Sequence, residues 1–382
     1  MKSRVMVQVA DRRIEEDEHE IPPVGSGEAL LRVEACGLCG SDVEQYRGSF
    51  AAKGIMRYPV IPGHEPIGRI AEIGKDAERM WGVKRGDRVA LEPHLSCGRC
   101  ELCLGGSYHN CRSLMPPGAP PCYGYTPRDV GHGLWGGYSD YIHLHERTIL
   151  HKVPDTMPLA LATLYQPIAA GIRWAVQLPK TEMGDTVLIL GHGQRGLGAV
   201  VAAREAGAST IIVTGTSRSA HKLRLAEALG ADFTIEADRE NTVARVMEIT
   251  NNRGVDVVLD VVPNFAQPVV DAVEAVRIGG TVVLSGIKGK DEIVKLDVDR
   301  MIYKEVTMKG VYSQARDAYI EAFRLLSENK YQLERLHTHE FTLDQAEEAL
   351  QTLGREINTG DHPICVSLHP DASTMNTLAT GG

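Results

Sequence analysis

Four cysteines lie close together in the segment SCGRCELCLGGSYHNC, as Cys97, Cys100, Cys103 and Cys111. Their spacing is C-x2-C-x2-C-x7-C, and short steps followed by a longer return can place four thiolates around one tetrahedral zinc ion. A zinc ion with four thiolate ligands has no open position for a substrate, so the spacing predicts a structural zinc site. We expect this site to brace a surface lobe of about residues 95–113.

A second group of candidate ligands lies nearer the N-terminus. Cys39 occurs in GLCGSD, and His64 and Glu65 occur together in PGHE. Cysteine and histidine are good zinc ligands, and a catalytic zinc keeps one position open for substrate. A single cysteine or histidine is more often a core residue, so these side chains predict a catalytic zinc only through the sequence around them.

Three glycines form the pattern G-x-G-x-x-G in GHGQRG, as Gly191, Gly193 and Gly196, with Gln194 and Arg195 between the last two. A strand-like run precedes the pattern and a helix-like run follows it, as a dinucleotide-binding turn requires. The first glycine permits the tight turn, the second lets the backbone approach a pyrophosphate, and the third allows close packing of helix on strand. Because the helix N-terminus also offers free N–H groups, the pattern predicts a cofactor site rather than a turn without a ligand.

The end of the next strand predicts which nicotinamide cofactor binds. An NAD site usually has a carboxylate there, about twenty residues after the turn, but this sequence has Gly215, Thr216, Ser217 and Arg218. Gly215 leaves room, the hydroxyls can donate hydrogen bonds, and Arg218 can pair with a phosphate. With Lys222 as a second possible cation, we favour NADP over NAD. The alternative is that Arg218 is only a solvated residue at a helix start.

The segments around these residues predict two kinds of architecture. Up to about residue 155, runs such as EALLRVEAC and IGRIAEI are separated by Gly and Pro, which predicts strands and loops. From about residue 160 to 310, strand-like runs such as TVLILG alternate with helix-like runs, which predicts a parallel sheet covered on both faces. A chain of 382 residues is long enough for two domains, so we predict an α/β protein with one β-rich domain and one doubly wound domain.

Composition narrows the classes of function. The formal net charge of -9 argues against a nucleic-acid-binding surface, and no apolar run approaches the length of a membrane span. The first residues, MKSRVMVQVADRRIEEDEHEI, are not typical of a signal peptide, so the clustered cysteines favour metal binding over disulfides. We expect a cytoplasmic enzyme that acts on a small molecule.

Several motifs together resemble the zinc-dependent medium-chain dehydrogenase/reductase family, the alcohol and polyol dehydrogenases. The matching motifs are GLCGSD, PGHE, GDRV with the four cysteines after it, WGGYSDY, GHGQRGLG and FTLDQAEEAL, and the resemblance extends to about Leu368. It implies a GroES-like β-rich catalytic domain, residues 1–156 and 318–382, and a Rossmann domain with a doubly wound parallel sheet, residues 157–317.

The resemblance also implies roles for individual residues. Cys39 and His64 would be ligands of a catalytic zinc, and Glu65 would be a ligand or a neighbour that exchanges with water. Asp42 would orient His64, a common support for a ligating imidazole. Ser41 would bind the substrate oxygen and begin the proton relay.

The sequence departs from the family pattern at three positions. Gln166, in LYQPIAAG, stands where relatives usually have a Cys or Glu ligand. Because a neutral amide is a poorer zinc ligand than a thiolate or carboxylate, either the zinc is held less tightly or Glu65 is the third protein ligand. Glu44 stands where many relatives place a histidine that passes the proton to solvent; it either does the same or is a solvated acid. Arg195 replaces a small apolar residue, and it contacts the cofactor or points to solvent.

We therefore predict the reversible oxidation of an alcohol to an aldehyde or ketone by hydride transfer with NAD(P), of which NADP is favoured. Ser41 would accept the hydroxyl proton and relay it through the cofactor ribose to Glu44. The resemblance implies two zinc ions per subunit, one catalytic and one structural, and a homodimer or homotetramer. The alternatives are a zinc-poor enoyl or quinone reductase of the same fold, a thiol-adduct dehydrogenase, and a nucleotide-binding protein without activity.

Other side chains give weaker signals. Tyr46, Phe50, Tyr125 and Trp135 lie near the motifs and are either walls of the substrate pocket or core residues. His337 and His339 in HTH alternate along an expected strand, which argues against a metal site there. Cys36 lies three residues before Cys39, a spacing at which two cysteines can bind one metal, but the resemblance implies that Cys36 is a packing residue.

Overall fold

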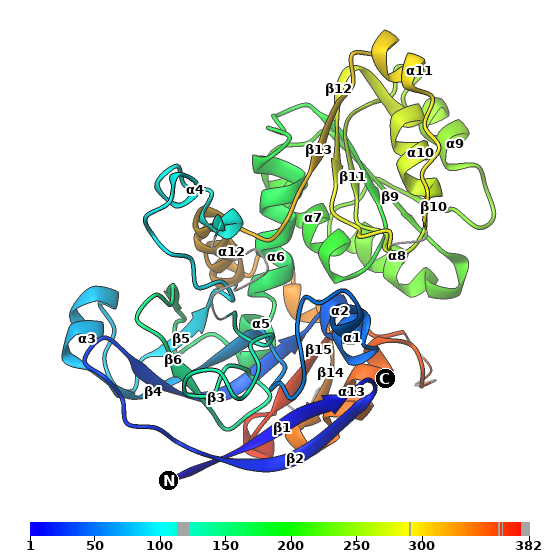
Figure 1. The fold of residues 1–382 in the computed structure, drawn as a ribbon. Coiled ribbons are helices and arrows are strands. Elements are labelled where there is room, and N and C mark those ends of the chain that lie inside the picture. The colour runs from blue at the N-terminus through cyan, green and yellow to red at the C-terminus, as the bar shows by residue number, and fades with distance from the viewer. Residues whose placement is uncertain (113–121, 290–291, 358–359, 361, 376–382) are drawn as a thin grey trace. The chain divides into compact units, whose positions relative to one another are not determined.

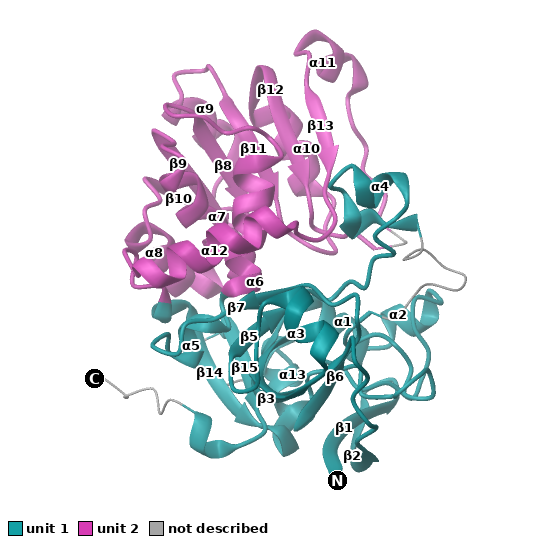
Figure 2. Ribbon diagram, turned by 90° about the vertical axis from the view of Figure 1, so that its left-hand side faces the viewer, with its two compact units in different colours: residues 1–164, 334–382 teal, residues 165–333 magenta. Residues whose placement is uncertain are grey.

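The computed structural model describes residues 1–112, 122–289, 292–357, 360 and 362–375. The chain forms two compact units, Met1–Leu164 with Glu334–Gly382, and Tyr165–Leu333 (Figure 2). The predicted boundaries at 156 and 317 differ from these at both ends. The helix Leu159–Ala162 lies in the first unit, and the helix Arg316–Glu328 lies in the second because it packs on the helix Tyr165–Gly171.

A seven-stranded sheet forms the centre of the first unit, in the order β14-β15-β3-β4-β5-β7, with β6 also paired to β3 (Figure 1). The strands are β3 (Ala29–Leu38), β4 (Glu65–Ile73), β5 (Arg88–Leu91), β6 (Tyr141–Leu144), β7 (Leu150–Lys152), β14 (His337–Thr342) and β15 (Cys365–His369). The pairing of β14 with β15 is parallel and the other pairings are antiparallel. A separate antiparallel pair is formed by β1 (Lys2–Ala10) and β2 (Arg13–Glu20).

A β-bulge in β3 decides which cysteine faces the core. The register with β4 shifts between Val33 and Ala35, and beyond the shift Cys36 and Leu38 belong to the hydrophobic core. Because side chains alternate along an extended chain, Cys39 points to the other side of the sheet from Cys36. The prediction of Cys36 as a packing residue agrees with this placement.

Short helices cover the first unit. They are α1 (Gly40–Tyr46), α2 (Ser49–Ala52), α3 (Lys75–Trp81), α4 (Glu101–Leu104), η1 (Tyr108–Asn110), α5 (Leu159–Ala162), η6 (Leu343–Gln345), α13 (Ala346–Leu353) and η7 (Ala372–Thr374). The turn η5 (Leu333–Leu336) joins the two units.

The second unit is a six-stranded parallel sheet in the order β10-β9-β8-β11-β12-β13. Its strands are β8 (Thr186–Leu190), β9 (Thr210–Gly215), β10 (Phe233–Glu236), β11 (Val255–Asp260), β12 (Val276–Leu284) and β13 (Thr307–Gly310). Its helices are α6 (Tyr165–Gly171), η3 (Ile172–Gln177), α7 (Gln194–Glu205), η4 (Ser217–Ser219), α8 (Ala220–Ala228), α9 (Thr242–Ile249), α10 (Gln267–Ala275), α11 (Val298–Tyr303) and α12 (Arg316–Glu328).

This strand order is that of a doubly wound dinucleotide-binding fold, 3-2-1-4-5-6 when the six strands are counted within the unit. Strands β8, β9 and β11 are short apolar runs, as a parallel sheet covered by helices requires, and β11 is buried along its whole length. The predicted α/β fold class, with a β-rich domain and a Rossmann domain, is confirmed. Among the described residues, no helix is both long and apolar enough to cross a membrane.

Candidate functional site

Cys39 lies at the junction between β3 and α1, where it is the N-cap of the helix. Its backbone N–H donates to Asp42 Oδ2 at 2.9 Å, and the Ser41 N–H donates to Cys39 Sγ at 3.3 Å. These reciprocal bonds satisfy N–H groups that a helix start would otherwise leave without partners. The helix start therefore holds Cys39, Ser41 and Asp42 in a fixed relation.

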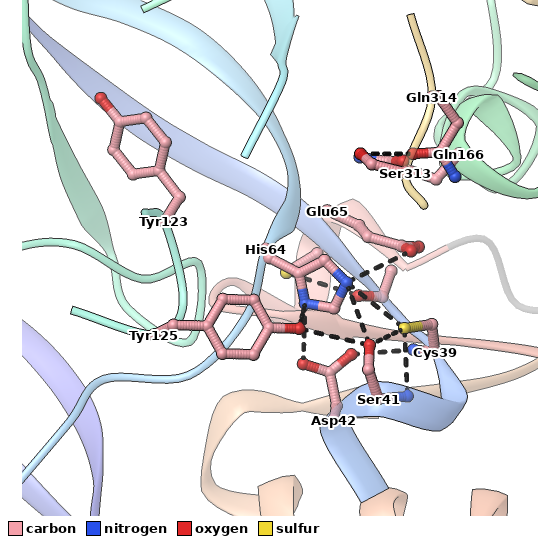
Figure 3. A network of polar contacts seen from close by, with 12 residues as sticks. Cys39, Ser41, Asp42, His64, Glu65, Tyr123, Tyr125, Gln166, Ser313 and Gln314 are labelled. Carbon is pink, nitrogen blue, oxygen red and sulfur yellow. Dashed lines mark hydrogen bonds and ion pairs between the residues drawn. The ribbon is translucent and has the colours of Figure 1, made fainter. Parts of the chain in front are cut away.

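His64 and Glu65 lie at the start of β4, next to Cys39. Glu65 begins β4 and is the register partner of Gly37 on β3. His64 Nε2 lies 3.3 Å from Cys39 Sγ and 3.6 Å from Glu65 Oε1 (Figure 3). The three ligand atoms all lie within 4.8 Å of one another, and the three residues are buried.

The donor set and its spacing fit a zinc ion. Zinc at ordinary bond lengths in a tetrahedron separates a sulfur from a nitrogen ligand by about 3.6 Å and a nitrogen from an oxygen ligand by about 3.4 Å. The two distances in the protein, 3.3 Å and 3.6 Å, are within a few tenths of an ångström of these values. Three protein ligands leave one coordination position open, as a catalytic site needs.

Asp42 contacts the His64 ring at Nδ1, the nitrogen that does not face Cys39. Its Oδ1 lies 3.1 Å from His64 Nδ1, and its side chain has no exposed surface. Burial lowers the pKa of His64, but the negative charges of Asp42 and Cys39 outweigh burial and raise that pKa well above its ordinary value. Metal binding at Nε2 would therefore release a proton, and the Nδ1–H···carboxylate bond would keep Nε2 available.

Ser41 and Tyr125 form the polar wall of this group. Ser41 Oγ lies 3.5 Å from His64 Nε2, and the Tyr125 hydroxyl donates to Ser41 Oγ at 3.2 Å. The same hydroxyl lies 3.2 Å from His64 Nδ1. Sequence reasoning named Tyr125 only as a pocket wall or core residue. Its ring also contacts Phe50.

The other two aromatic candidates are core residues. Tyr46 belongs to the core cluster beneath α1 and α13, and Trp135 belongs to the second core cluster of the unit. Both were predicted to be either pocket walls or core residues, and in the structure both are core residues.

Glu44 and Gln166 have partners of their own. Glu44 accepts a hydrogen bond from Ser49 at 2.8 Å and lies 3.5 Å from the Arg47 guanidinium. Gln166 lies on α6 in the second unit, where its Oε1 accepts from the Tyr319 hydroxyl at 2.9 Å. The relay role of Glu44 and the ligand role of Gln166 stay predictions.

The four clustered cysteines converge as the spacing predicts. Their sulfur atoms lie within 4.8 Å of one another, with separations of 3.5 Å from Cys100 to Cys103, 3.8 Å from Cys100 to Cys111 and 3.9 Å from Cys97 to Cys103. Thiolates on a tetrahedral zinc lie about 3.8 Å apart. Residue 113, the last of the predicted lobe, lies outside the described residues.

Backbone N–H groups stabilise the sulfurs of Cys97 and Cys100 as thiolates and lower the pKa of both. Hydrogen bonds from the N–H groups of Arg99 and Cys100 lower the pKa of Cys97 to about 6. Burial instead raises the pKa of Cys103 to about 12. The group holds four sulfurs at zinc-binding distances and offers no further ligand position, which is the geometry of a structural site.

The glycine turn of the second unit has the geometry of a cofactor site. Gly191 has a φ of +108°, which favours glycine. A Cβ on Gly196 would lie 2.0 Å from the Gly191 carbonyl oxygen, whereas a Cβ on Gly193 would meet no atom within 4 Å. The first and third glycines are therefore needed by the fold, and the second leaves the backbone open to a ligand.

The two residues between these glycines begin α7. Gln194 is its first residue, and the Arg195 guanidinium lies 5.2 Å from the centre of the Trp174 ring. The Arg195 side chain is thus stacked on an aromatic ring rather than extended into solvent.

The end of β9 differs from expectation in two ways. A Cβ on Gly215 would lie 2.6 Å from the His192 ring, so the space beside this glycine is filled by an imidazole. Asp238, after β10, accepts hydrogen bonds from Ser217 N–H at 2.8 Å and from Ser217 Oγ at 2.7 Å. The strand end itself carries no carboxylate, but the turn after the neighbouring strand supplies Asp238, which sequence reasoning missed.

The cationic candidates differ in exposure. Arg218 in η4 is exposed, and Thr216 before it is partly exposed. Lys222 on α8 is only 2% exposed. Of the two predicted cations, Arg218 is thus the one open to a phosphate from solvent.

Comparison with known proteins identifies the family. Residues 25–155 match the family model of the alcohol dehydrogenase GroES-like domain, and residues 196–328 match that of the zinc-binding dehydrogenases. A probable alcohol dehydrogenase of Mycobacterium tuberculosis is 39% identical over 369 residues, which are 96% of this chain and 98% of that protein. The chain belongs to the zinc-dependent medium-chain dehydrogenase/reductase family.

Two further members of this family extend the comparison. A sorbitol dehydrogenase of Bacillus subtilis is 31% identical over 351 residues, 92% of this chain and 93% of that protein. The structure of a zinc-binding dehydrogenase of Sinorhizobium meliloti bound to NADP has a TM-score of 0.82 at 26% identity, and the match covers 97% of this chain and 100% of the other. The predicted family and the predicted class of reaction, interconversion of alcohols with aldehydes or ketones, are confirmed.

Proposed function

We propose that this dehydrogenase oxidises an alcohol with NADP at the group of Cys39, His64 and Glu65. The observation that carries the proposal is the convergence of three zinc-ligand atoms within 4.8 Å, with one coordination position open. A zinc ion held there would polarise the substrate oxygen and lower the pKa of the alcohol, and the nicotinamide would accept the hydride.

The protein's own residues handle the proton. Ser41 Oγ lies close enough to the ligand atoms to accept the hydroxyl proton, and the Tyr125 hydroxyl donates to Ser41 Oγ at 3.2 Å and so orients it. Burial raises the pKa of Tyr125 well above its ordinary value, so this hydroxyl stays protonated and acts as a donor. Asp42 holds the His64 tautomer that leaves Nε2 available. Glu44 is proposed as the onward acceptor.

A paired measurement of metal content and turnover tests the proposal. Cys39→Ser should lose one zinc per chain and nearly all alcohol oxidation, measured over a panel of simple alcohols and polyols because relatives include alcohol and sorbitol dehydrogenases. Cys36→Ala is the matched control, since Cys36 packs in the core on the other side of β3, and it should keep its zinc. Full alcohol oxidation in Cys39→Ser would overturn the proposal.

The choice of NADP is supported by the absence of a carboxylate at the end of β9, by the exposed Arg218 and by the NADP-bound relative. NAD is the second candidate, because the Asp238 carboxylate lies against Ser217 and would repel a phosphate placed there.

The ratio of kcat/KM for NADP and NAD separates the two candidates. If NADP is the cofactor, the wild type prefers it and Arg218→Ala reduces that preference by about tenfold, the effect of one charge-assisted phosphate contact. If NAD is the cofactor, the wild type prefers NAD and Asp238→Asn weakens that preference. Glu236→Gln, two residues from Asp238 and paired with Arg239, is the control and should change neither ratio.

Assembly and location stay predictions. We propose a homodimer or homotetramer, which light scattering on the purified chain measures directly, and a cytoplasmic location, which fractionation of the source cells measures.

A further inference from the structure

A second polar cluster is buried in the first unit, at the edge of its sheet where β14 and β15 lie side by side (Figure 1). His337 is 2% exposed, Ser367 and His369 are fully buried, and the Glu340 side chain is 5% exposed. Neither the glycine turn nor the two cysteine-containing groups include any of these residues. The histidines of HTH do lie on a strand as predicted, but the cluster was not expected.

The strand register explains why these side chains meet. Residues three apart on a regular strand face opposite sides, but the pairing of β14 with β15 is irregular between His337 and His339. A bulge of one residue turns His337 to the face of Glu340. Glu340 is the register partner of Ser367, and Ser367 and His369, two residues apart, share that face.

The hydrogen bonds of the cluster define where its protons are. The Thr374 hydroxyl donates to the Asp371 carbonyl at 2.7 Å, so its oxygen is left to accept from His369 Nδ1 at 3.1 Å. Both imidazole rings are buried, where the neutral form with one proton is favoured. His369 Nε2 is then an acceptor, and it receives the Ser367 hydroxyl at 2.8 Å.

The same chain of bonds determines the tautomer of His337. Because the Ser367 proton points to His369, Ser367 Oγ accepts from His337 Nε2–H at 2.8 Å. His337 Nδ1 is left with a lone pair and no hydrogen-bond partner among the described residues. It faces Glu340 Oε1 at 3.7 Å. A nitrogen lone pair and a carboxylate oxygen are both atoms that a transition-metal ion binds.

We propose that His337, Glu340 and His369 bind a divalent transition-metal ion, with zinc as the metal tested. Two histidines and one glutamate are a ligand set that zinc uses. Glu340 Oε1 lies 3.7 Å from His337 Nδ1 and 3.8 Å from His369 Nε2, and the three ligand atoms are within 4.8 Å of one another. A tetrahedral zinc needs about 3.4 Å between such atoms, so the two separations from Glu340 must contract by only a few tenths of an ångström.

Ser367 completes the site without being a ligand. When its hydroxyl turns away from His369, the Nε2 atom becomes available to the metal. Ser367 Oγ still accepts from His337 Nε2–H and so orients that ring, as outer partners of ligating histidines commonly do. The metal would tie β14, the edge strand of the sheet, to β15.

The site is distinct from the Cys39 group. In one row across the sheet, Glu65 pairs with Gly37, Gly37 with Ser367, and Ser367 with Glu340. Three strand spacings of about 4.8 Å separate β4 from β14, which is about 14 Å. The two groups therefore cannot share a ligand.

Zinc counting on the full chain tests the proposal, with zinc alone as the probe. The wild type, loaded with zinc and freed of loosely bound metal by gel filtration, should hold one zinc more per chain than His337→Gln and than Glu340→Gln. This difference does not depend on what the other two groups bind. His339→Gln is the matched control, because His339 stacks on Phe341 and is no part of the cluster; it should hold as much zinc as the wild type.

Equal zinc content in the wild type and in folded Glu340→Gln would overturn the proposal. A measurement on the wild type alone covers the case in which the variants do not fold. Anomalous diffraction at the zinc edge should show a peak between His337, Glu340 and His369, and a map with peaks only at the other groups would overturn the proposal.

Discussion

Asp42→Asn provides the sharpest test of how the first unit prepares a metal ligand. The carboxylate makes two buried contacts, with His64 Nδ1 at 3.1 Å and with the Cys39 N–H at 2.9 Å. Both contacts need an acceptor. An asparagine has one acceptor oxygen and one NH2 group, so it can satisfy only one of them.

Either orientation of the asparagine penalises zinc binding. With its oxygen on the Cys39 N–H, its NH2 group donates to His64 Nδ1, and the imidazole proton moves to Nε2, the atom that faces Cys39 Sγ. With its oxygen on His64, its NH2 group opposes the Cys39 N–H. A buried donor without a partner costs about 1–3 kcal/mol. Since about 1.4 kcal/mol is a factor of ten, zinc affinity should fall roughly 5- to 150-fold.

Competition with a chromophoric zinc chelator measures the effect, and the zinc of the four-cysteine group is the internal standard. In Asp42→Asn, the zinc of the four-cysteine group should stay bound, while the zinc affinity of the Cys39 group should fall. Glu44→Gln also removes a carboxylate from α1, but Glu44 contacts Ser49 and Arg47, so its zinc affinity should match the wild type. An affinity of Asp42→Asn within twofold of the wild type would refute the argument that this carboxylate sets the tautomer.

Three further predictions concern stability and cofactor binding. Cys103→Ser should lose one zinc per chain and unfold at a lower temperature while keeping the zinc of the Cys39 group; a fully stable variant that had lost only turnover would contradict a structural role. Burial raises the pKa of Asp256, but hydrogen bonds from two arginines outweigh it and lower the pKa to about 2. Because this pKa is depressed below the ordinary 3.8, the stabilisation exists above about pH 4 and is lost as the pH falls toward 2. Asp256→Asn should therefore cost about 1–2 kcal/mol at pH 7 in denaturant unfolding, and a cost that is constant down to pH 2 would be inconsistent with this. Gly196→Ala should lower the free energy of unfolding by about 1–3 kcal/mol or more. Gly193→Ala should unfold like the wild type and bind the cofactor more weakly in calorimetry. Equal stability and equal cofactor affinity of the two variants would contradict the different roles of these glycines.

The sequence was sufficient wherever the determining residues are neighbours along the chain. The four cysteines need only a turn and a short return to converge, so their spacing predicts their meeting. The glycine turn lies between a strand and a helix that the apolar pattern already marks. Cys39, Ser41 and Asp42 share one helix start, where local hydrogen bonds determine their arrangement. In each case, short-range backbone geometry carries the information.

Other features depend on which strands pair and in what register, and only the tertiary structure decided them. Tyr125 meets Ser41, Asp238 meets Ser217, and His369 meets His337, each across many residues of chain. One shift of register in β14 turns His337 toward Glu340. A single-residue bulge exchanges the two faces of a strand, and no local pattern specifies it. Sequence by itself therefore determined the family and the local ligand groups, while sheet register decided which distant side chains complete them.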